Sequence, residues 1–158
     1  MTTYVAVVGP GDARPEEVAA AREIGRLLAE AGAIVLTGGL GGVMAAATAG
    51  ASAAGGLTVA LLPGTDRSVS SATVAIPTGL GELRNALLVR AADAVIAVGG
   101  SWGTLSEIAL AQRTGVPVVC LGGWEVVGAG ASLPTAETPA DAVAKLGVGA
   151  PETGTMKA

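Results

Sequence analysis

Short apolar runs rich in β-branched residues alternate along this chain with longer stretches rich in alanine and leucine. The short runs are continuously apolar, which is typical of strands covered on both faces of a sheet. The strands are predicted at residues 4–8, 34–37, 57–62, 73–76, 94–98 and 116–121. Helices are predicted at residues 15–31, 42–54, 81–92, 103–114 and 139–146. This order predicts an α/β fold: a Rossmann-like, doubly wound and mostly parallel sheet flanked by helices.

The length and composition fit one folded domain. A chain of 158 residues with 51% hydrophobic and 14% charged residues can bury a substantial core. We expect a single nucleotide-binding domain over residues 1–146 and a flexible C-terminal tail over residues 147–158.

Several classes of chemistry are excluded by what the chain lacks. It contains no histidine, which excludes His-based catalytic triads and His-ligated metals, and Cys120 is the single cysteine. No metal site and no resident cofactor are expected. The net charge of −4, without a basic run, argues against nucleic acid or an anionic membrane as a partner.

The region 31–65 carries no charge, but paired glycines interrupt it, so we expect buried elements rather than a membrane span. The N-terminus lacks the basic region of a secretory signal, which predicts a cytoplasmic protein.

Glycine-rich turns follow three of the predicted strands. The carboxyl ends of parallel strands share one edge of a sheet, and ligands bind there near the switch in strand order. Helices that start after such turns offer free N–H groups to an anion. Three such turns predict a phosphorylated, nucleotide-like ligand. The expected contacts are Gly9 and Gly11 in the first turn, Gly38, Gly39 and Gly41 in the second, and Gly99, Gly100, Ser101, Trp102, Gly103 and Thr104 in the third.

A standard dinucleotide site is not expected. Arg14 stands where the third glycine of that fingerprint belongs, and the second strand ends in Thr37 rather than an acidic residue. A Walker A sequence is also absent from the chain. Asp12 is either a turn residue or a ribose contact.

The sequence RNALLVRAADAVIAVGGSWGTLSE at residues 84–107 resembles the LOG ("Lonely guy") phosphoribohydrolase family of the SLOG superfamily, formerly mislabelled lysine decarboxylases. Arg84, Arg90 and Asp93 keep the spacing of that family. Gly100, Gly103, Thr104 and Glu107 match its glycine-rich motif. A decarboxylase that uses pyridoxal phosphate is excluded, because Lys145 and Lys157 both lie beyond the last predicted strand.

The resemblance implies hydrolysis of the N-glycosidic bond of a nucleoside 5′-monophosphate. Arg84 and Glu107 would be catalytic, and the turn at residues 100–104 would hold the 5′-phosphate. Arg90 and Asp93, more simply a local i,i+3 pair, would orient the site.

The chain departs from the LOG motif at three positions: Gly99 replaces a proline, Ser101 a glycine and Asn85 a lysine. In these departures it is similar to a sister branch of molybdenum-cofactor carriers and small DprA-related proteins. The alternative function is therefore a non-catalytic carrier of a phosphorylated pterin or nucleotide, with the molybdenum cofactor as its cargo.

Three side chains allow more than one interpretation. Thr104 and Glu107 have the spacing of a capping box, so Glu107 is either a helix cap or a group that faces the ligand. Trp102 either stacks on a base or fills the turn. Arg84 is either a solvated helix residue or an anion contact, for which a guanidinium is well suited.

The predicted helix 42–54 has no charged residue on any face, which indicates burial on more than one side. Together with Leu87, Leu88 and Val89, it predicts a homo-oligomer, most simply a dimer.

Overall fold

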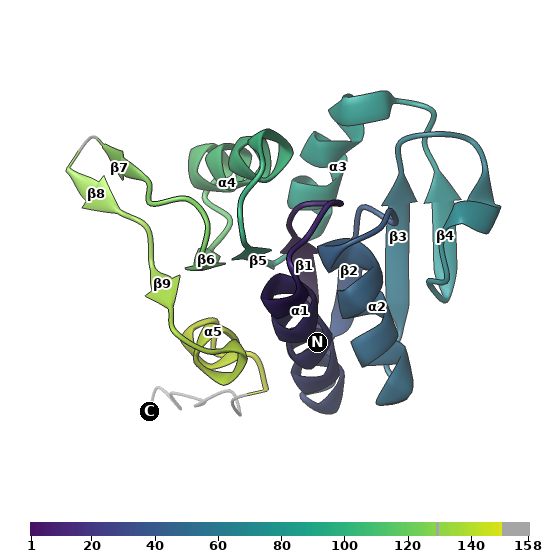
Figure 1. The fold of residues 1–158 in the computed structure, drawn as a ribbon, viewed down its shortest axis with the longest axis horizontal. Helices are drawn as coiled ribbons and strands as arrows, with labels where there is room; N and C mark the ends of the chain where they lie inside the picture. The colour runs from purple at the N-terminus through teal and green to yellow at the C-terminus, as the bar shows by residue number, and fades with distance from the viewer. Residues whose placement is uncertain (129, 150–158) are drawn as a thin grey trace, which may run out of the picture.

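The computed structural model describes residues 1–128 and 130–149 and contains one seven-stranded parallel sheet. Across the sheet the strands follow the order β4-β3-β2-β1-β5-β6-β9 (Figure 1). Their bounds are β1 Tyr4–Val8, β2 Ile34–Thr37, β3 Thr58–Leu62, β4 Val74–Pro77, β5 Ala94–Val98, β6 Val118–Leu121 and β9 Thr135–Ala136. The predicted α/β, Rossmann-like fold class is confirmed.

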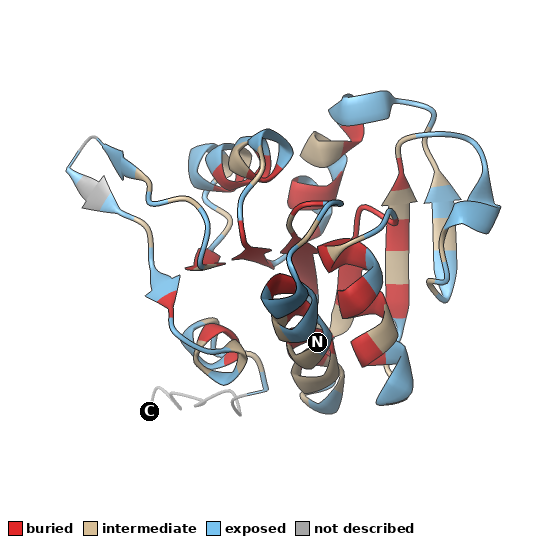
Figure 2. Ribbon diagram, viewed as in Figure 1, coloured by how far each residue is buried: buried red, intermediate tan, exposed pale blue. Residues whose placement is uncertain are grey.

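Helices cover both faces of the sheet. One layer contains α1 (Pro15–Glu30), α2 (Val43–Ala53) and α5 (Pro139–Lys145), and the other contains α3 (Arg84–Ala91) and α4 (Trp102–Thr114) (Figure 1). Strand β1 shows why the strands read as unbroken apolar runs. Val5 and Val7 pack under the first layer, whereas Ala6 and Val8 pack under the second. Both faces of the central strands are therefore buried, as Figure 2 shows.

Helices α1 and α2 pack backbone to backbone at glycines. A Cβ atom at Gly25 would meet the backbone of Ala47, and one at Gly50 would meet the backbone of Arg22. This close approach buries most of α2 within one chain and explains why the helix carries no charge. Leu88 and Val89 likewise lie in the core, whereas Leu87 is 44% exposed. The residues that suggested an oligomer are thus largely covered by the chain itself.

Some elements differ from the prediction. The predicted helix 81–92 consists of a short 3-10 helix η2 (Gly81–Leu83) followed by α3. The α-helix cannot begin at Gly81, because the φ of 58° at that residue is not helical. A further 3-10 turn, η1 (Arg67–Val69), precedes β4. The region after β6 contains the hairpin strands β7 (Val127–Gly128) and β8 (Ala131–Ser132), and then β9. These two-residue strands were missed because they are too short to show any periodicity.

The structure describes only residues 147–149 of the expected C-terminal tail. Val148 packs against the core under α1 and α5, and residues 150–158 lie outside the described residues. Within the described part of the chain, no helix has both the length and the apolar character that crossing a membrane requires.

Candidate functional site

A cavity of about 140 Å³ opens at the carboxyl ends of the strands, near the point where the strand order reverses between β1 and β5. This is where ligands bind in open α/β sheets. The cavity brings together eight of the residues expected at the site: Gly9, Gly11, Gly38, Arg84, Ser101, Gly103, Thr104 and Glu107. Its remaining lining residues are Val8, Met44, Asn85 and Leu88.

Arg84 is the charged centre of the cavity. It is the first residue of α3, is 6% exposed, and lies against the second glycine turn. A Cβ atom at Gly38 would lie 2.8 Å from Cζ of Arg84, so only glycine leaves room for the guanidinium there. The interpretation of Arg84 as a solvated helix residue is therefore wrong.

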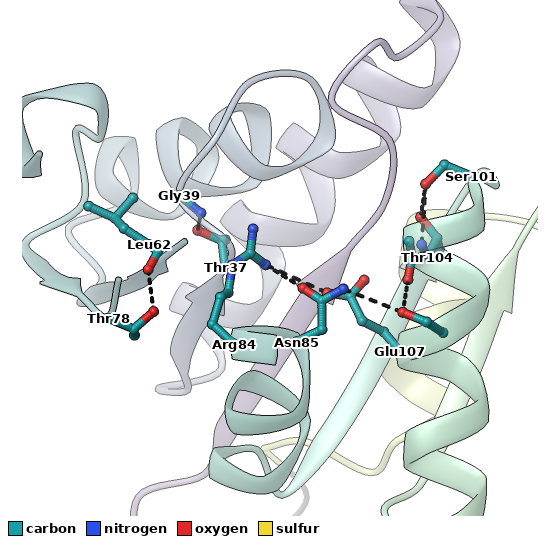
Figure 3. Close-up of polar contacts among 11 residues, drawn as sticks. Thr37, Gly39, Leu62, Thr78, Arg84, Asn85, Ser101, Thr104 and Glu107 are labelled. Atoms are coloured by element: carbon teal, nitrogen blue, oxygen red, sulfur yellow. Dashed lines mark hydrogen bonds and ion pairs between the residues drawn. The ribbon is translucent and has the colours of Figure 1, made fainter. Parts of the chain in front are cut away.

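The hydrogen bonds of Arg84 are incomplete. Its Nη1 donates to Oδ1 of Asn85 over 2.9 Å, and its buried Nε has no partner among the described residues (Figure 3). Burial lowers the pKa of Arg84, against the opposing effect of the Glu107 charge, yet an arginine remains protonated in a protein. A buried guanidinium with an unbonded N–H group is suited to receive an anion.

Glu107 faces Arg84 from the second turn of α4. It is 6% exposed, and its Oε1 lies 3.8 Å from Nη1 of Arg84. Burial raises the pKa of Glu107 to about 7, and the nearby Arg84 only partly opposes this rise. Near neutral pH the carboxyl group can therefore accept or donate a proton.

Glu107 is not a helix cap. Helix α4 begins one residue before Gly103, and its N-cap is Ser101, whose Oγ accepts the N–H of Thr104 over 3.2 Å. The hydroxyls of Ser101 and Thr104 also lie 3.0 Å apart. Because Ser101 already caps the helix, Thr104 lies inside the first turn, and of the two interpretations of Glu107 the capping box with Thr104 is wrong.

Trp124 supports the third glycine turn, and the sequence analysis did not single it out. Its Nε1 donates to the carbonyl of Ser101 over 2.9 Å, and its ring contacts Gly100. Trp102 packs on Trp124 with ring centroids 5.0 Å apart and is itself 78% exposed. It borders a groove between α3 and α4 rather than the cavity. The sequence signal that could have indicated this contact is the presence of two tryptophans in a chain with only three aromatic residues.

The other glycines of the turns do not line the cavity. Gly39 packs on Leu62 and Ala60, Gly41 lies exposed beside Gly11, Gly99 covers Glu17, and Gly100 contacts Trp124. Asp12 is exposed.

Arg90 and Asp93 lie away from the cavity. Arg90 is exposed, and the carboxylate of Asp93 accepts the N–H of Tyr4 over 2.8 Å at the amino end of β1. That is the opposite edge of the sheet. Among the described residues, no ion pair joins Arg90 to Asp93.

Known proteins resemble this chain in sequence and in fold. The sequence profile of the SLOG cluster4 family matches residues 2–146. An uncharacterized protein of Archaeoglobus fulgidus is 43% identical over 118 residues, which are 74% of this chain and 78% of that protein.

Solved structures show the same fold. The molybdenum cofactor binding protein of Rippkaea orientalis is 34% identical with a TM-score of 0.86, over 92% of this chain and 96% of that one. The Moco carrier protein of Chlamydomonas reinhardtii is 36% identical with a TM-score of 0.83, over the same shares of the two chains. DNA processing protein A from Helicobacter pylori is 20% identical with a TM-score of 0.62, over 92% of this chain and 73% of that one. At this identity the similarity concerns the fold alone.

Proposed function

This chain belongs to the SLOG cluster4 family, and we propose that it binds a small phosphorylated ligand in the cavity beneath α3 and α4 and carries it without converting it. The cargo that fits best is a phosphorylated pterin such as the molybdenum cofactor. The observation that carries the proposal is the incomplete bonding of the buried Arg84. Its guanidinium lies 3.8 Å from the Glu107 carboxylate, beyond hydrogen-bond distance, and its Nε has no hydrogen-bond partner among the described residues. The proteins of Rippkaea and Chlamydomonas, named for binding and carrying this cofactor, support the choice of cargo.

The dimensions of the cavity favour one part of such a ligand. Pockets for whole small molecules measure about 300–1,000 Å³, and this cavity measures about 140 Å³. It therefore suits the phosphate group. Arg84 would pair with the phosphate oxygens, and the N-terminus of α4, whose dipole favours an anion, would face them. The ring would then lie outside the cavity.

Equilibrium binding tests the carrier function. The purified protein is titrated with the molybdenum cofactor released under anaerobic conditions from a molybdoenzyme, and bound cofactor is separated by gel filtration and quantified by its fluorescent oxidation product. We expect stoichiometric binding that inorganic phosphate weakens by competition. A wild-type protein that retains no cofactor at micromolar concentration would contradict the proposal.

A second candidate is hydrolysis of a nucleoside 5′-monophosphate, which the Arg84–Glu107 pair and the pKa of Glu107 near 7 support. The C1′–N bond would break, hydroxide from water would add to C1′, and the departing base would take the proton. Glu107 would stabilise the positive charge that develops at the ribose or orient the water.

Incubation with AMP separates the two functions. A carrier releases no adenine or ribose 5-phosphate over hours. Release that disappears in Glu107→Gln would assign the enzyme instead.

A further inference from the structure

A chain of polar contacts connects α3 to the first turn of α4. Nη1 of Arg84 donates to Oδ1 of Asn85 over 2.9 Å, and Nδ2 of Asn85 donates to Oγ of Ser106 over 3.4 Å (Figure 3). Oγ of Ser106 in turn donates to the carbonyl of Gly103 over 2.6 Å. The half-buried amide of Asn85 thus lies between the guanidinium and the turn that begins α4.

This chain of contacts competes with the pair of opposite charges beside it. Arg84 and Glu107 are the two charged side chains that line the cavity, and both are buried. Such a pair gains most when its atoms reach hydrogen-bond distance. Here Nη1 and Oε1 remain 3.8 Å apart, while the same Nη1 is bonded to the amide oxygen of Asn85.

A neutral acceptor has a different consequence from a carboxylate. An amide oxygen fixes the direction of a guanidinium N–H group but leaves the positive charge uncompensated. A full ion pair with Glu107 would compensate that charge and make Arg84 a weaker receptor for an anion. The side chain at position 85 therefore decides whether the positive charge of Arg84 remains uncompensated and can attract an anionic ligand.

We propose that Asn85 is a positioning residue that holds the guanidinium of Arg84 away from Glu107 and available to an anionic ligand. The part of this inference that concerns ligand affinity rests on the function proposed above. The part that concerns the Arg84–Glu107 pair does not, because it is measured on the protein without ligand.

Two near-isosteric variants separate positioning from general loss of structure. Asn85→Leu removes the acceptor, so Arg84 turns to Glu107. Asn85→Asp keeps an acceptor at the same place and adds a negative charge. The carboxyl pKa of Glu107 is followed by ¹³C NMR titration and assigned with Glu107→Gln.

The two variants are expected to affect the pKa of Glu107 differently. In Asn85→Leu it falls by about 1–3 units, because an opposite charge at close range favours the carboxylate. In Asn85→Asp it stays near its original value or rises. Gln112→Leu removes an exposed amide from the far end of α4 and is the matched control, with no change expected.

Ligand affinity provides the second measurement. Both variants at position 85 lose at least about 10-fold in affinity for a phosphorylated ligand, and Gln112→Leu keeps the wild-type affinity. A pKa of Glu107 that is unchanged or higher in Asn85→Leu would overturn the inference. If Asn85→Leu does not fold, a fall of that pKa in Asn85→Asp overturns it just as well. A wild-type protein that binds no ligand overturns the proposed function but leaves the pKa result to decide the role of Asn85.

Discussion

At the scale of single residues, the two charged groups of the cavity could be identified from the sequence, but their surroundings could not. Spacing placed Arg84 and Glu107 on neighbouring helices, yet it equally allowed a solvated arginine and a capping glutamate. The structure decides because Gly38 leaves room for the guanidinium and because Ser101 has already capped α4. Burial of both side chains then sets their charge behaviour.

Arg84 is expected to carry most of the affinity for an anion. Replacing it in Arg84→Met should weaken binding of a phosphorylated ligand by about 10- to 100-fold, because a hydrogen bond to a charged group contributes about 1.5–3 kcal/mol. Isothermal titration calorimetry measures the loss. Arg90→Met removes an exposed arginine from the same helix and should bind like the wild type. Equal losses in both variants would show that general charge, rather than the buried site, attracts the ligand.

Glu107 should make stability depend on pH. Its pKa is raised to about 7 from a usual value of 4.5, so the folded protein binds more protons than the unfolded chain between these two values. The resulting stabilisation is fully present below pH 4.5 and is lost as the pH rises to about 7.

Urea unfolding between pH 5 and pH 8 measures this effect as a difference between proteins. Between pH 5 and pH 8 the free energy of unfolding of the wild type should fall by on the order of 1–3 kcal/mol relative to that of Glu107→Gln, whose side chain cannot titrate. The exposed Glu30 provides the control variant Glu30→Gln, which should keep the wild-type slope. Parallel pH profiles of the wild type and Glu107→Gln would mean that the carboxyl group keeps an ordinary pKa.

At the scale of elements, the long helices and the central strands follow directly from the pattern of apolar residues. Strands β1, β2 and β5 begin and end where the sequence predicts. The short strands β7, β8 and β9 do not show in the pattern, because two residues are too few to form a periodic pattern. Their pairing depends on which strands lie beside them in the fold. The start of α4 was predicted one residue late, because Ser101 is one of three hydroxyl residues able to cap it.

The N-cap of α4 provides a test at this scale. Ser101→Ala should destabilise the protein by about 0.5–2 kcal/mol, because the N–H of Thr104 loses its acceptor. Ser101→Gly should cost only a few tenths of a kcal/mol of stability, because glycine is itself a favourable N-cap residue. Chemical denaturation of the three proteins gives these differences. An alanine variant as stable as the wild type would indicate that Thr104 or water replaces the cap.

At the scale of the whole molecule, large apolar side chains are exposed around α3 and α4. Leu83 at the end of η2, Leu87 on α3 and Trp102 at the start of α4 are 73%, 44% and 78% exposed. Exposed apolar side chains that gather on one side of a protein often mark an interface. The expected homo-oligomer, most simply a dimer, is best sought here and not at α2, which α1 already covers.

Light scattering at micromolar concentration tests this expectation. The wild type should have twice the mass of one chain, and Leu83→Glu should shift it toward the monomer. Leu57→Glu, at an exposed leucine before β3, should leave the mass unchanged. A monomeric wild type would exclude the dimer.

The alternation of apolar runs, the burial of both sheet faces and the gathering of three glycine turns at one sheet edge all follow from local chemistry, because strand and helix periodicities and the direction of parallel strands are properties of the chain itself. Which charged side chains enter the cavity follows only from tertiary packing. Arg84 and Arg90 lie on one helix and Asp93 lies just beyond it, yet Arg84 is buried beside Gly38, Arg90 is exposed and Asp93 binds the far end of β1. A few residues along a helix or loop change the face or the sheet edge that a side chain reaches, and only the packed neighbours decide which one is covered.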